Sequence, residues 1–334
     1  MMADKHKHKN KTVELMCPAG NLETAKLAID SGADAIYAGV TNLSMRPKRV
    51  EFSDDDFNTL IEYTQHRGKK LYATMNICPK PSDVDNFKRR VAEIYEQGVD
   101  AVIVSDVGMM SWIHQNYPKL PIHASIMTSI VNVESAKFYH DLGARVVLVS
   151  RSLDDLKGLK EIREEAGVDI ELFVHGGICY MFDGYCYMSS YWRQEWGYDG
   201  DMGAMRLFGQ NNTKGECHLI CKRECGLRKG DNQVATGRLM RRHDDVGLKN
   251  LPFYLDIGVK ILKIEGRAMP AYYIEEATKL YRRAIDLYQG DPEKYIISDE
   301  WSAVVERLIE ARWEYERRWD IQRQTQEWER QTAT

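Results

Sequence analysis

Short apolar runs alternate with amphipathic stretches from Val13 onward, and glycine-containing turns such as SGADA and QGVDA separate them. Within residues 84–97, Phe87, Val91 and Ile94 recur at the spacing of one helical face. The turns place glycine just after a helix, where left-handed backbone suits glycine best. The apolar runs predict eight strands, which are Glu14–Cys17, Ala35–Val40, Lys70–Ile77, Ala101–Ser105, Ile122–Ile126, Arg145–Val149, Ile170–Val174 and Ile261–Ile264.

This alternation of strands and helices indicates a parallel sheet with right-handed crossovers. Eight such units predict an α/β fold, a closed (β/α)8 TIM-like barrel, in which the active site lies at the carboxyl ends of the strands. An open doubly wound sheet is the alternative. No GxGxxG follows the first strand, so a dinucleotide-binding fold has no support from a motif.

The regular spacing breaks once, between the seventh strand and the eighth. Residues 177–245 are far more than a helix and two loops require, so we expect an insertion at the active-site end of strand seven. The insertion is rich in Tyr, Trp, Met, Gly and Asn and has few periodic apolar runs. It is therefore predicted to need a bound metal for its order.

Three further segments complete the predicted organisation. Residues 1–12 are polar and basic and are expected to form a disordered tail, followed by the barrel over residues 13–290. Residues 291–334 are expected to form a C-terminal helical extension, whose long helix begins near Asp299 and carries several tryptophans. We expect that helix either to pack across the barrel or to form the contact with a second copy of the chain in a homodimer or with a paralogous subunit.

The composition excludes few function classes. Of 334 residues, 43% are hydrophobic and 29% are charged, and the net charge of −4 gives no global attraction to nucleic acid. No apolar run of about 18 residues is present, so no membrane span is expected. The N-terminus lacks the apolar core of a signal peptide, and we therefore expect a cytoplasmic protein.

Most of the cysteine residues lie in the predicted insertion. Five of the seven cysteines lie there, with intervals of six residues in the first pair and three residues in each later pair. In the cytoplasm such clusters are more often metal ligands than disulfides. Zinc, with His175 or His218 as further ligands, is one alternative, although no CxxC knuckle occurs. Buried apolar thiols and a nucleophilic Cys17 are the others.

Several separated motifs resemble the family of U32, or collagenase-like, peptidases. Glu14–Asn21 is similar to its E-L-x-x-P-A-G-N segment, and Gly32–Gly39 to its GADAxYxG segment. Phe173–Ser190 resembles F-V-H-G-x-x-C-x-x-x-x-G-x-C-x-x-S-S, and Gly215–Lys222 resembles G-x-C-x-x-x-C-[KR]. Lys263–Arg267 matches K-I-E-G-R. The Ser-x-Gln common near strand five is Ser-Ile-Met here.

The resemblance implies an oxygen-independent hydroxylase with a [4Fe-4S] cluster and prephenate as the source of the hydroxyl group. Its members of this kind act on tRNA, 23S rRNA or ubiquinone precursors. It also implies that Cys225 is a spare thiol of structural role. A peptidase and a non-catalytic cluster-bearing subunit of a heteromeric complex remain alternatives. The ligands that it implies are Cys179, Cys186, Cys217 and Cys221.

Polar residues near the strand ends are the candidates for the reaction itself. Arg267 is expected to hold a carboxylate of the co-substrate or to pair with Glu265, and His175 to transfer a proton or to orient a loop. The basic tract over residues 221–229, with Arg238, Arg241 and Arg242 beyond it, would meet RNA phosphates or form a solvated face. The aromatic insertion suits a small aromatic or quinone-type substrate equally well. The candidate catalytic residues are His175, Glu265 and Arg267, and the candidate substrate-binding residues are Arg46, Asn76, Arg151 and Arg267.

Overall fold

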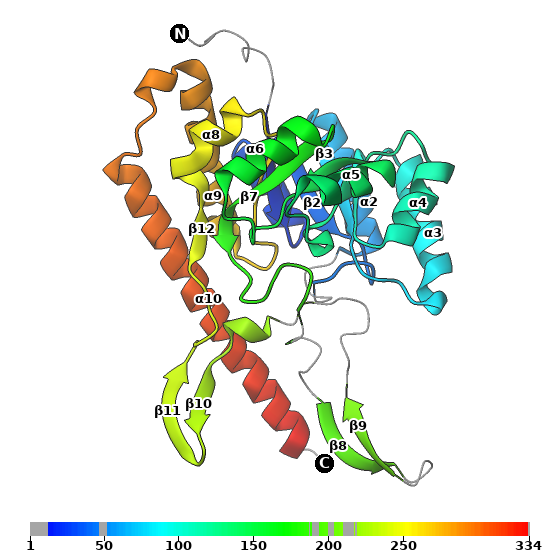
Figure 1. Cartoon of the computed structure of the whole chain (residues 1–334), viewed down its shortest axis with the longest axis vertical. Helices are drawn as coiled ribbons and strands as arrows, with labels where there is room; N and C mark the ends of the chain where they lie inside the picture. Colours follow the sequence, from blue (N-terminus) through cyan, green and yellow to red (C-terminus); the bar gives the residue numbers. More distant parts are fainter. Residues whose placement is uncertain are drawn as a thin grey trace.

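Eight parallel strands close into a barrel in the computed structural model of this chain, which describes residues 13–46, 52–186, 188, 194–199, 204–209, 217 and 219–332 (Figure 1). The predicted tail of residues 1–12 lies outside these ranges. The closing contact joins the sixth strand to the seventh. The barrel strands are β1 (Glu14–Ala19), β2 (Ala35–Gly39), β3 (Lys70–Met75), β4 (Ala101–Val104), β5 (Ile122–Ala124), β6 (Ala144–Leu148), β7 (Asp169–Gly177) and β13 (Ile261–Ile264).

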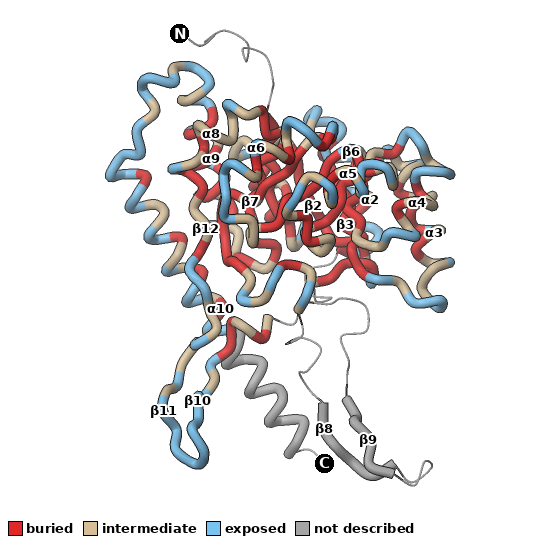
Figure 2. The backbone as a smooth tube through the Cα atoms, viewed as in Figure 1, coloured by how far each residue is buried: buried red, intermediate tan, exposed pale blue. Residues whose placement is uncertain are grey.

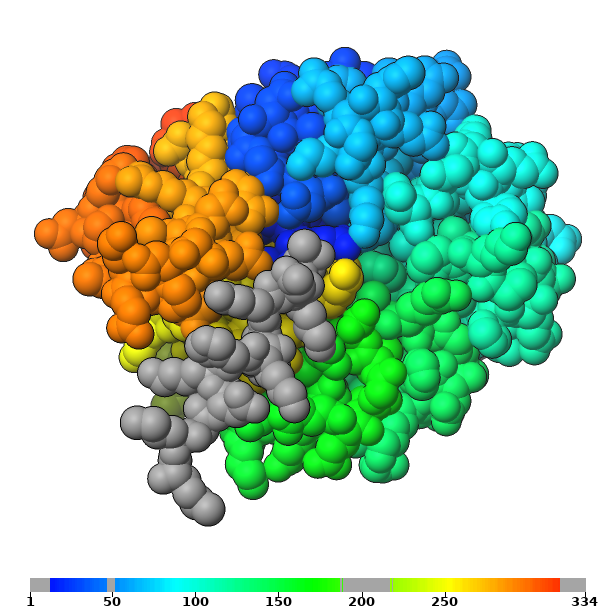
Figure 3. Space-filling model, turned by 90° about the horizontal axis from the view of Figure 1, so that it is seen from above, coloured from blue at the N-terminus to red at the C-terminus, as the bar shows by residue number. Residues whose placement is uncertain are grey.

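Helices follow most of the strands and form an outer layer, so that the chain runs around the ring in sequence order (Figure 3). The helices are α1 (Leu22–Asp30), α2 (Asp54–His66), α3 (Pro81–Glu96), α4 (Val107–Asn116), α5 (Val133–Asp141), α6 (Leu156–Glu165), α8 (Leu251–Asp256), α9 (Ala271–Gly290) and α10 (Asp299–Thr332). The predicted (β/α)8 barrel is therefore confirmed, and the open sheet is wrong.

Local signals in the sequence explain where the helices begin. The side chains of Asn21, Ser53, Asp106, Asn132 and Asp155 each accept a hydrogen bond from a backbone N–H group in the first turn of the helix that follows. These caps satisfy donors that a helix start leaves without a partner. They also fix the residue at which each of these strand-to-helix loops ends and its helix begins.

Buried residues are concentrated in the barrel strands and on the inner sides of the helices around them (Figure 2), and their apolar side chains form two clusters. The larger cluster fills the space between the strands and the helices, and it includes Leu15, Ile36 and Tyr281. The smaller cluster lies inside the barrel and includes Met16, Tyr37 and Ile103. Because successive side chains of a strand point to opposite faces, each strand contributes to both clusters.

The insertion leaves the barrel after β7 and returns to it. It contains the hairpins β8 (Gln194–Asp199)–β9 (Ala204–Gly209) and β10 (Cys225–Lys229)–β11 (Asn232–Gly237), and β10–β11 projects away from the barrel (Figure 1). Strand β12 (Asp244–Val246) then pairs antiparallel with the end of β7. This pairing carries β7 to Gly177, three residues beyond its predicted end at Val174. Between Cys217 and β10, a 3₁₀ turn covers Ile220–Lys222.

The C-terminal extension packs against the barrel as a long helix. Trp301 and Leu308 of α10 are 3% exposed and join the main core, next to α9. Burying such side chains stabilises the contact by about 2 kcal/mol each. No helix in the described ranges is long and apolar enough to cross a membrane.

Candidate active site

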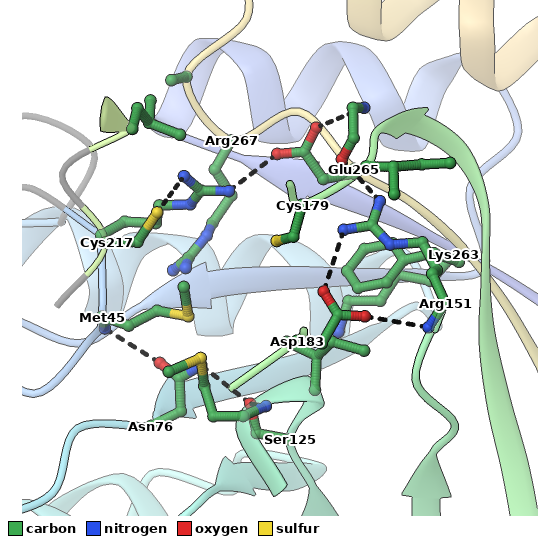
Figure 4. A pocket seen from close by; sticks show the side chains of 18 of the residues that line it. Met45, Asn76, Ser125, Arg151, Cys179, Asp183, Cys217, Lys263, Glu265 and Arg267 are labelled. Carbon is green, nitrogen blue, oxygen red and sulfur yellow. Dashed lines mark hydrogen bonds and ion pairs between the residues drawn. The ribbon is translucent and has the colours of Figure 1, made fainter. Parts of the chain in front are cut away.

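A cavity of about 110 Å³ opens at the carboxyl ends of the barrel strands (Figure 4). The loops after β2, β3 and β6 contribute Arg46, Asn76 and Arg151 to its lining, and the loop after β13 contributes Glu265 and Arg267. The structure thus brings five of the six predicted catalytic and substrate-binding residues to one cavity. Their common position follows from the parallel topology, which gathers the carboxyl ends of all strands at one rim.

Three of the four predicted ligands line this cavity: Cys179, Cys217 and Cys221. The thiols are half-buried and form no disulfide. Burial, then nearby Asp183, raises the pKa of Cys179, and Cys217 adds to the increase. Burial likewise raises the pKa of Cys221, with smaller contributions from Cys217 and Cys186. The four predicted ligands therefore influence one another electrostatically, although Cys186 is not part of the lining.

Three thiols in one lining are donors of the type that an iron–sulfur cluster uses. Among the described residues, no three His, Cys, Asp or Glu side chains are placed to hold one metal ion. A single zinc ion would need sulfur ligands about 3.8 Å apart, whereas a cluster spreads its thiolates around a larger inorganic core. Cationic side chains also surround the thiols, and Arg46 Nη1 donates to Cys217 Sγ at 3.5 Å. Positive charge of this kind compensates thiolates and a net-negative cluster.

Glu265 is the centre of a network of arginines at the rim. Its Oε1 lies 3.1 Å from Arg46 Nη2, and its Oε2 lies 2.6 Å from Arg312 Nη1. The backbone N–H of Gly177 also donates to Oε2. Burial alone would raise the pKa of Glu265, but Arg312, Arg46 and Arg151 hold it well below its ordinary value. Glu265 therefore stays ionised and pairs with Arg46 and Arg312.

A second network attaches the first cysteine loop to the barrel. Asp183 is 2% exposed, and its Oδ2 accepts hydrogen bonds from the Ser150 hydroxyl at 2.9 Å and from the Arg151 backbone N–H at 3.0 Å. Arg151 Nη1 donates to the Gly177 carbonyl oxygen at 2.8 Å, and its guanidinium lies over the Phe173 ring. These contacts fix the loop between Cys179 and Cys186 from both ends.

The remaining predicted binding residues differ in how they are engaged. Asn76 accepts from the Met45 N–H and donates to Ser125 Oγ, so it braces two loops. Arg267 Nη1 donates to Ser44 Oγ at 2.7 Å. Within the described part of the chain, Arg151 Nε and Thr74 Oγ1 of the lining are buried polar atoms without a hydrogen-bond partner. Unsatisfied buried donors of this kind mark a place where a polar ligand would bind.

His175 is the predicted site residue that the structure keeps out of the cavity lining. It is 1% exposed and packs between the rings of Tyr273 and Tyr281. Burial, followed by the charge of Arg312, lowers the pKa of His175 to about 3, so its ring is neutral near pH 7. Its Nε2 is buried and has no hydrogen-bond partner among the residues that the structure describes. The predicted proton transfer therefore has no support from its position.

A charged cluster inside the barrel escaped the sequence analysis. Lys263, which lines the cavity, lies 2.6 Å from Glu171 Oε1, and His123 Nδ1 lies 3.0 Å from Glu171 Oε2. All three residues are at most 3% exposed. Although burial alone would raise it, Lys263 and His123 lower the pKa of Glu171 to about 2. The available signal was the single charged residue in each of two otherwise apolar strands, IELFV and ILKI.

The basic tract beyond the cysteines is partly neutralised. Arg241 is buried between Asp244 and Glu316, at 3.1 Å from each, and its guanidinium stacks on Trp313. Arg238 donates to the Trp313 carbonyl oxygen. By contrast, the exposed residues Arg228 and Lys229 remain on the β10–β11 hairpin. The positive charge available to an RNA is therefore smaller than the sequence suggests.

Comparison with known proteins agrees with the sequence motifs. Residues 20–330 match the sequence profile of Peptidase family U32. The chain is 30% identical over 265 residues to the tRNA hydroxylation protein P of Escherichia coli, covering 78% of this chain and 55% of that protein. It is 29% identical over 276 residues to the 23S rRNA 5-hydroxycytidine synthase of the same organism, covering 82% and 39%.

A third relative carries a different name. An uncharacterized protease of Methanocaldococcus jannaschii is 36% identical over 289 residues, covering 82% of this chain and 65% of that protein. The chain thus spans from about two-fifths to about two-thirds of the length of these three relatives. Both names current among the relatives, hydroxylase and protease, bear on the function of the cavity.

Proposed function

Because the chain belongs to peptidase family U32, we propose that it is an iron–sulfur-dependent, oxygen-independent hydroxylase that acts on RNA. The observation that carries this proposal is the set of three thiols in the lining of a cavity that is also lined by arginines. The names of the E. coli relatives supply the reaction and the class of substrate. An RNA substrate implies a cytoplasmic protein.

In this proposal Cys179, Cys217 and Cys221, together with Cys186, hold a [4Fe-4S] cluster. A bound cluster would supply one-electron redox chemistry. The protein's own contribution is positional. Its rim partly shields the thiols from bulk water, and its arginines balance their negative charge.

The same cavity offers a place for the hydroxyl donor, which we propose to be prephenate or a similar organic acid. Arg151 and Arg267 are the residues that would bind its carboxylate groups, because a guanidinium matches a carboxylate in a bidentate contact. Arg151 is favoured by its buried Nε, for which the described residues provide no hydrogen-bond partner. Glu265 stays ionised and so acts as an orienting group for Arg46 and not as a proton donor.

The alternatives predict different results. A peptidase, the name that the M. jannaschii relative carries, would keep its activity after iron is removed. A non-catalytic subunit would bind a cluster but need a paralogous partner for activity. A small aromatic or quinone-type molecule remains the alternative substrate.

The direct test uses nucleosides from tRNA and rRNA of cells with and without the gene. Mass spectrometry should find one nucleoside that gains the mass of an oxygen atom only when the protein is present. Anaerobic incubation of purified, cluster-loaded protein with RNA from the deletion strain and prephenate should restore it. If the nucleosides are identical in both strains while quinone hydroxylation changes, the RNA assignment is wrong.

A further inference from the structure

The C-terminal helix α10 forms part of the cavity wall, although it lies outside the eight repeats of the barrel (Figure 1). Arg312, Tyr315 and Glu316 of α10 belong to the lining. Arg312 and Glu316 are four residues apart, so both side chains lie on the face that meets the barrel. The helix is therefore in a position to influence the chemistry of the site.

Arg312 is the residue by which α10 reaches the rim. Its guanidinium contacts both the side chain and the backbone of Glu265. Arg312 Nη1 lies 2.6 Å from the carboxylate oxygen Oε2, and Arg312 Nη2 donates a hydrogen bond to the backbone carbonyl oxygen at 2.9 Å. Its Nε and Nη2 also donate to the Tyr273 hydroxyl at 3.1 and 3.0 Å. The side chain is 3% exposed. A planar fork of donors suits this set of acceptors, whereas a lysine could not satisfy all of them.

The loop that leads to the first cysteine leaves room for this arginine. A Cβ atom on Gly176 would lie 3.0 Å from Arg312 Nη2, and one on Gly177 would lie 3.3 Å from Arg312 Nη1. Gly176 also has a φ of +122°, which side-chain-bearing residues rarely adopt. The two glycines thus permit the close approach between α10 and the end of β7.

Two short paths lead from Arg312 to the predicted ligands. Glu265 Oε1 pairs with Arg46, whose Nη1 donates to Cys217 Sγ. Glu265 Oε2 accepts from the N–H of Gly177, which precedes Cys179 by two residues. One carboxylate, held by Arg312, therefore orients groups next to both Cys217 and Cys179.

We infer that Arg312 is a positioning residue for the thiol site, which acts through Glu265 on Arg46 and on the loop that carries Cys179. This inference rests on the proposed cluster at the four cysteines. The C-terminal helix is accordingly a component of the site, beyond any role in contacting a partner. Without Arg312, Arg46 would be the ion-pair partner left to Glu265 among the described residues, and a positive charge would leave the vicinity of the cluster.

The rival explanation is that Arg312 only fastens α10 to the barrel. Other residues already hold α10 in place, because Trp301 and Leu308 pack in the barrel core, and Glu316 pairs with Arg241 of the insertion at 3.1 Å. A purely structural Arg312 would change the melting temperature but not the properties of a cluster in protein that remains folded. The two explanations therefore separate in spectroscopic measurements.

The experiment compares Arg312→Gln, Arg312→Lys and the double variant Glu265→Gln/Arg312→Gln with wild type. Arg318→Gln is the matched control, since Arg318 lies on the same helix, is 74% exposed and contacts Glu314. Each full-length chain is reconstituted anaerobically. Iron and sulfide per chain, the visible spectrum, the midpoint potential and the melting temperature of the metal-free protein are measured.

We expect Arg312→Gln to bind less iron and to shift the midpoint potential to a more negative value, because the reduced cluster loses a stabilising positive charge. The double variant should lie closer to wild type than Arg312→Gln, and Arg312→Lys should keep the potential but retain less iron. An unchanged spectrum, iron content and potential in Arg312→Gln would overturn the inference. If wild type itself binds no iron, the proposed function fails instead.

Discussion

Different interactions stabilise the barrel and the cysteine-rich insertion. Barrel side chains such as Leu15, Val102 and Val147 are fully buried among other apolar groups. The described part of the insertion instead relies on Asp183 and Lys222, buried polar residues that bind backbone or hydroxyl groups of neighbouring segments. The barrel can therefore fold without a metal, whereas the insertion depends on polar anchors and, in our proposal, on the cluster.

The largest expected effect comes from removing one predicted ligand, and it should affect the cluster but not the barrel. Cys217→Ala should abolish cluster binding and hydroxylation, because it removes a ligand in the cavity. It should leave the melting temperature of the metal-free barrel unchanged. Cys225→Ala is the matched control, since the thiol of Cys225 lies on the β10 hairpin near the Gly237 carbonyl oxygen. Equal iron content in both variants would rule out the assigned ligand set.

The next prediction concerns the charged cluster inside the barrel. Glu171→Gln leaves the Lys263 ammonium buried without its counter-charge and should lower the free energy of unfolding by about 4 kcal/mol. Urea denaturation measures this change, and Glu164→Gln on the surface of α6 is the control.

The ion pair between Glu171 and Lys263 should also make the stability of the barrel depend on pH. The pKa of Glu171 is about 2 in the folded protein, below its ordinary value of 4.5. Its contribution is therefore complete above pH 4.5 and is lost as the pH falls toward 2. Below pH 4.5, the difference in unfolding free energy between wild type and Glu171→Gln should shrink; a constant difference would show that the carboxylate is not paired.

A smaller effect is expected at the junction of barrel and insertion. Glu265→Gln removes the charge that Arg46 and Arg312 share, and it should reduce the unfolding free energy by about 3 kcal/mol. The exposed α10 residue Glu314, which contacts Arg318, provides the control variant Glu314→Gln. If both variants unfold at the same urea concentration, the network does not stabilise the junction.

The smallest effect should be confined to the first cysteine loop. Asp183→Asn weakens the contacts to Ser150 and Arg151 and should cost about 1 kcal/mol. Hydrogen exchange should become faster over residues 178–186 and stay unchanged in the barrel strands. The exposed residue Asp154 serves as control in Asp154→Asn. Faster exchange throughout the barrel would mean that the two regions unfold together.

The parts of this molecule that could be predicted from the sequence are those with a regular pattern of apolar residues. Eight apolar runs gave the barrel, and the break after strand seven located the insertion. The strand-end positions of Arg46, Asn76 and Arg151 sufficed to place them in the cavity, because parallel strands end at one rim.

Contacts between segments far apart in the chain were beyond such an analysis. Arg312 lies in a helix whose many charges have no clear periodicity, so nothing distinguished it from its exposed neighbours. His175 was placed at a strand end, but whether its ring faces the cavity or Tyr281 depends on packing that only the structure defines. Likewise, the pairing of Arg241 with Glu316 reduced a basic tract that looked available to RNA.

Iron and sulfide counting on anaerobically purified wild-type protein, with a visible spectrum, tests the central claim most directly. The account predicts about four iron and four sulfide per chain, with broad absorbance that disappears when Cys179, Cys186, Cys217 or Cys221 is replaced by alanine. Metal-replete protein that holds zinc or no metal, or a spectrum that survives all four replacements, would contradict it.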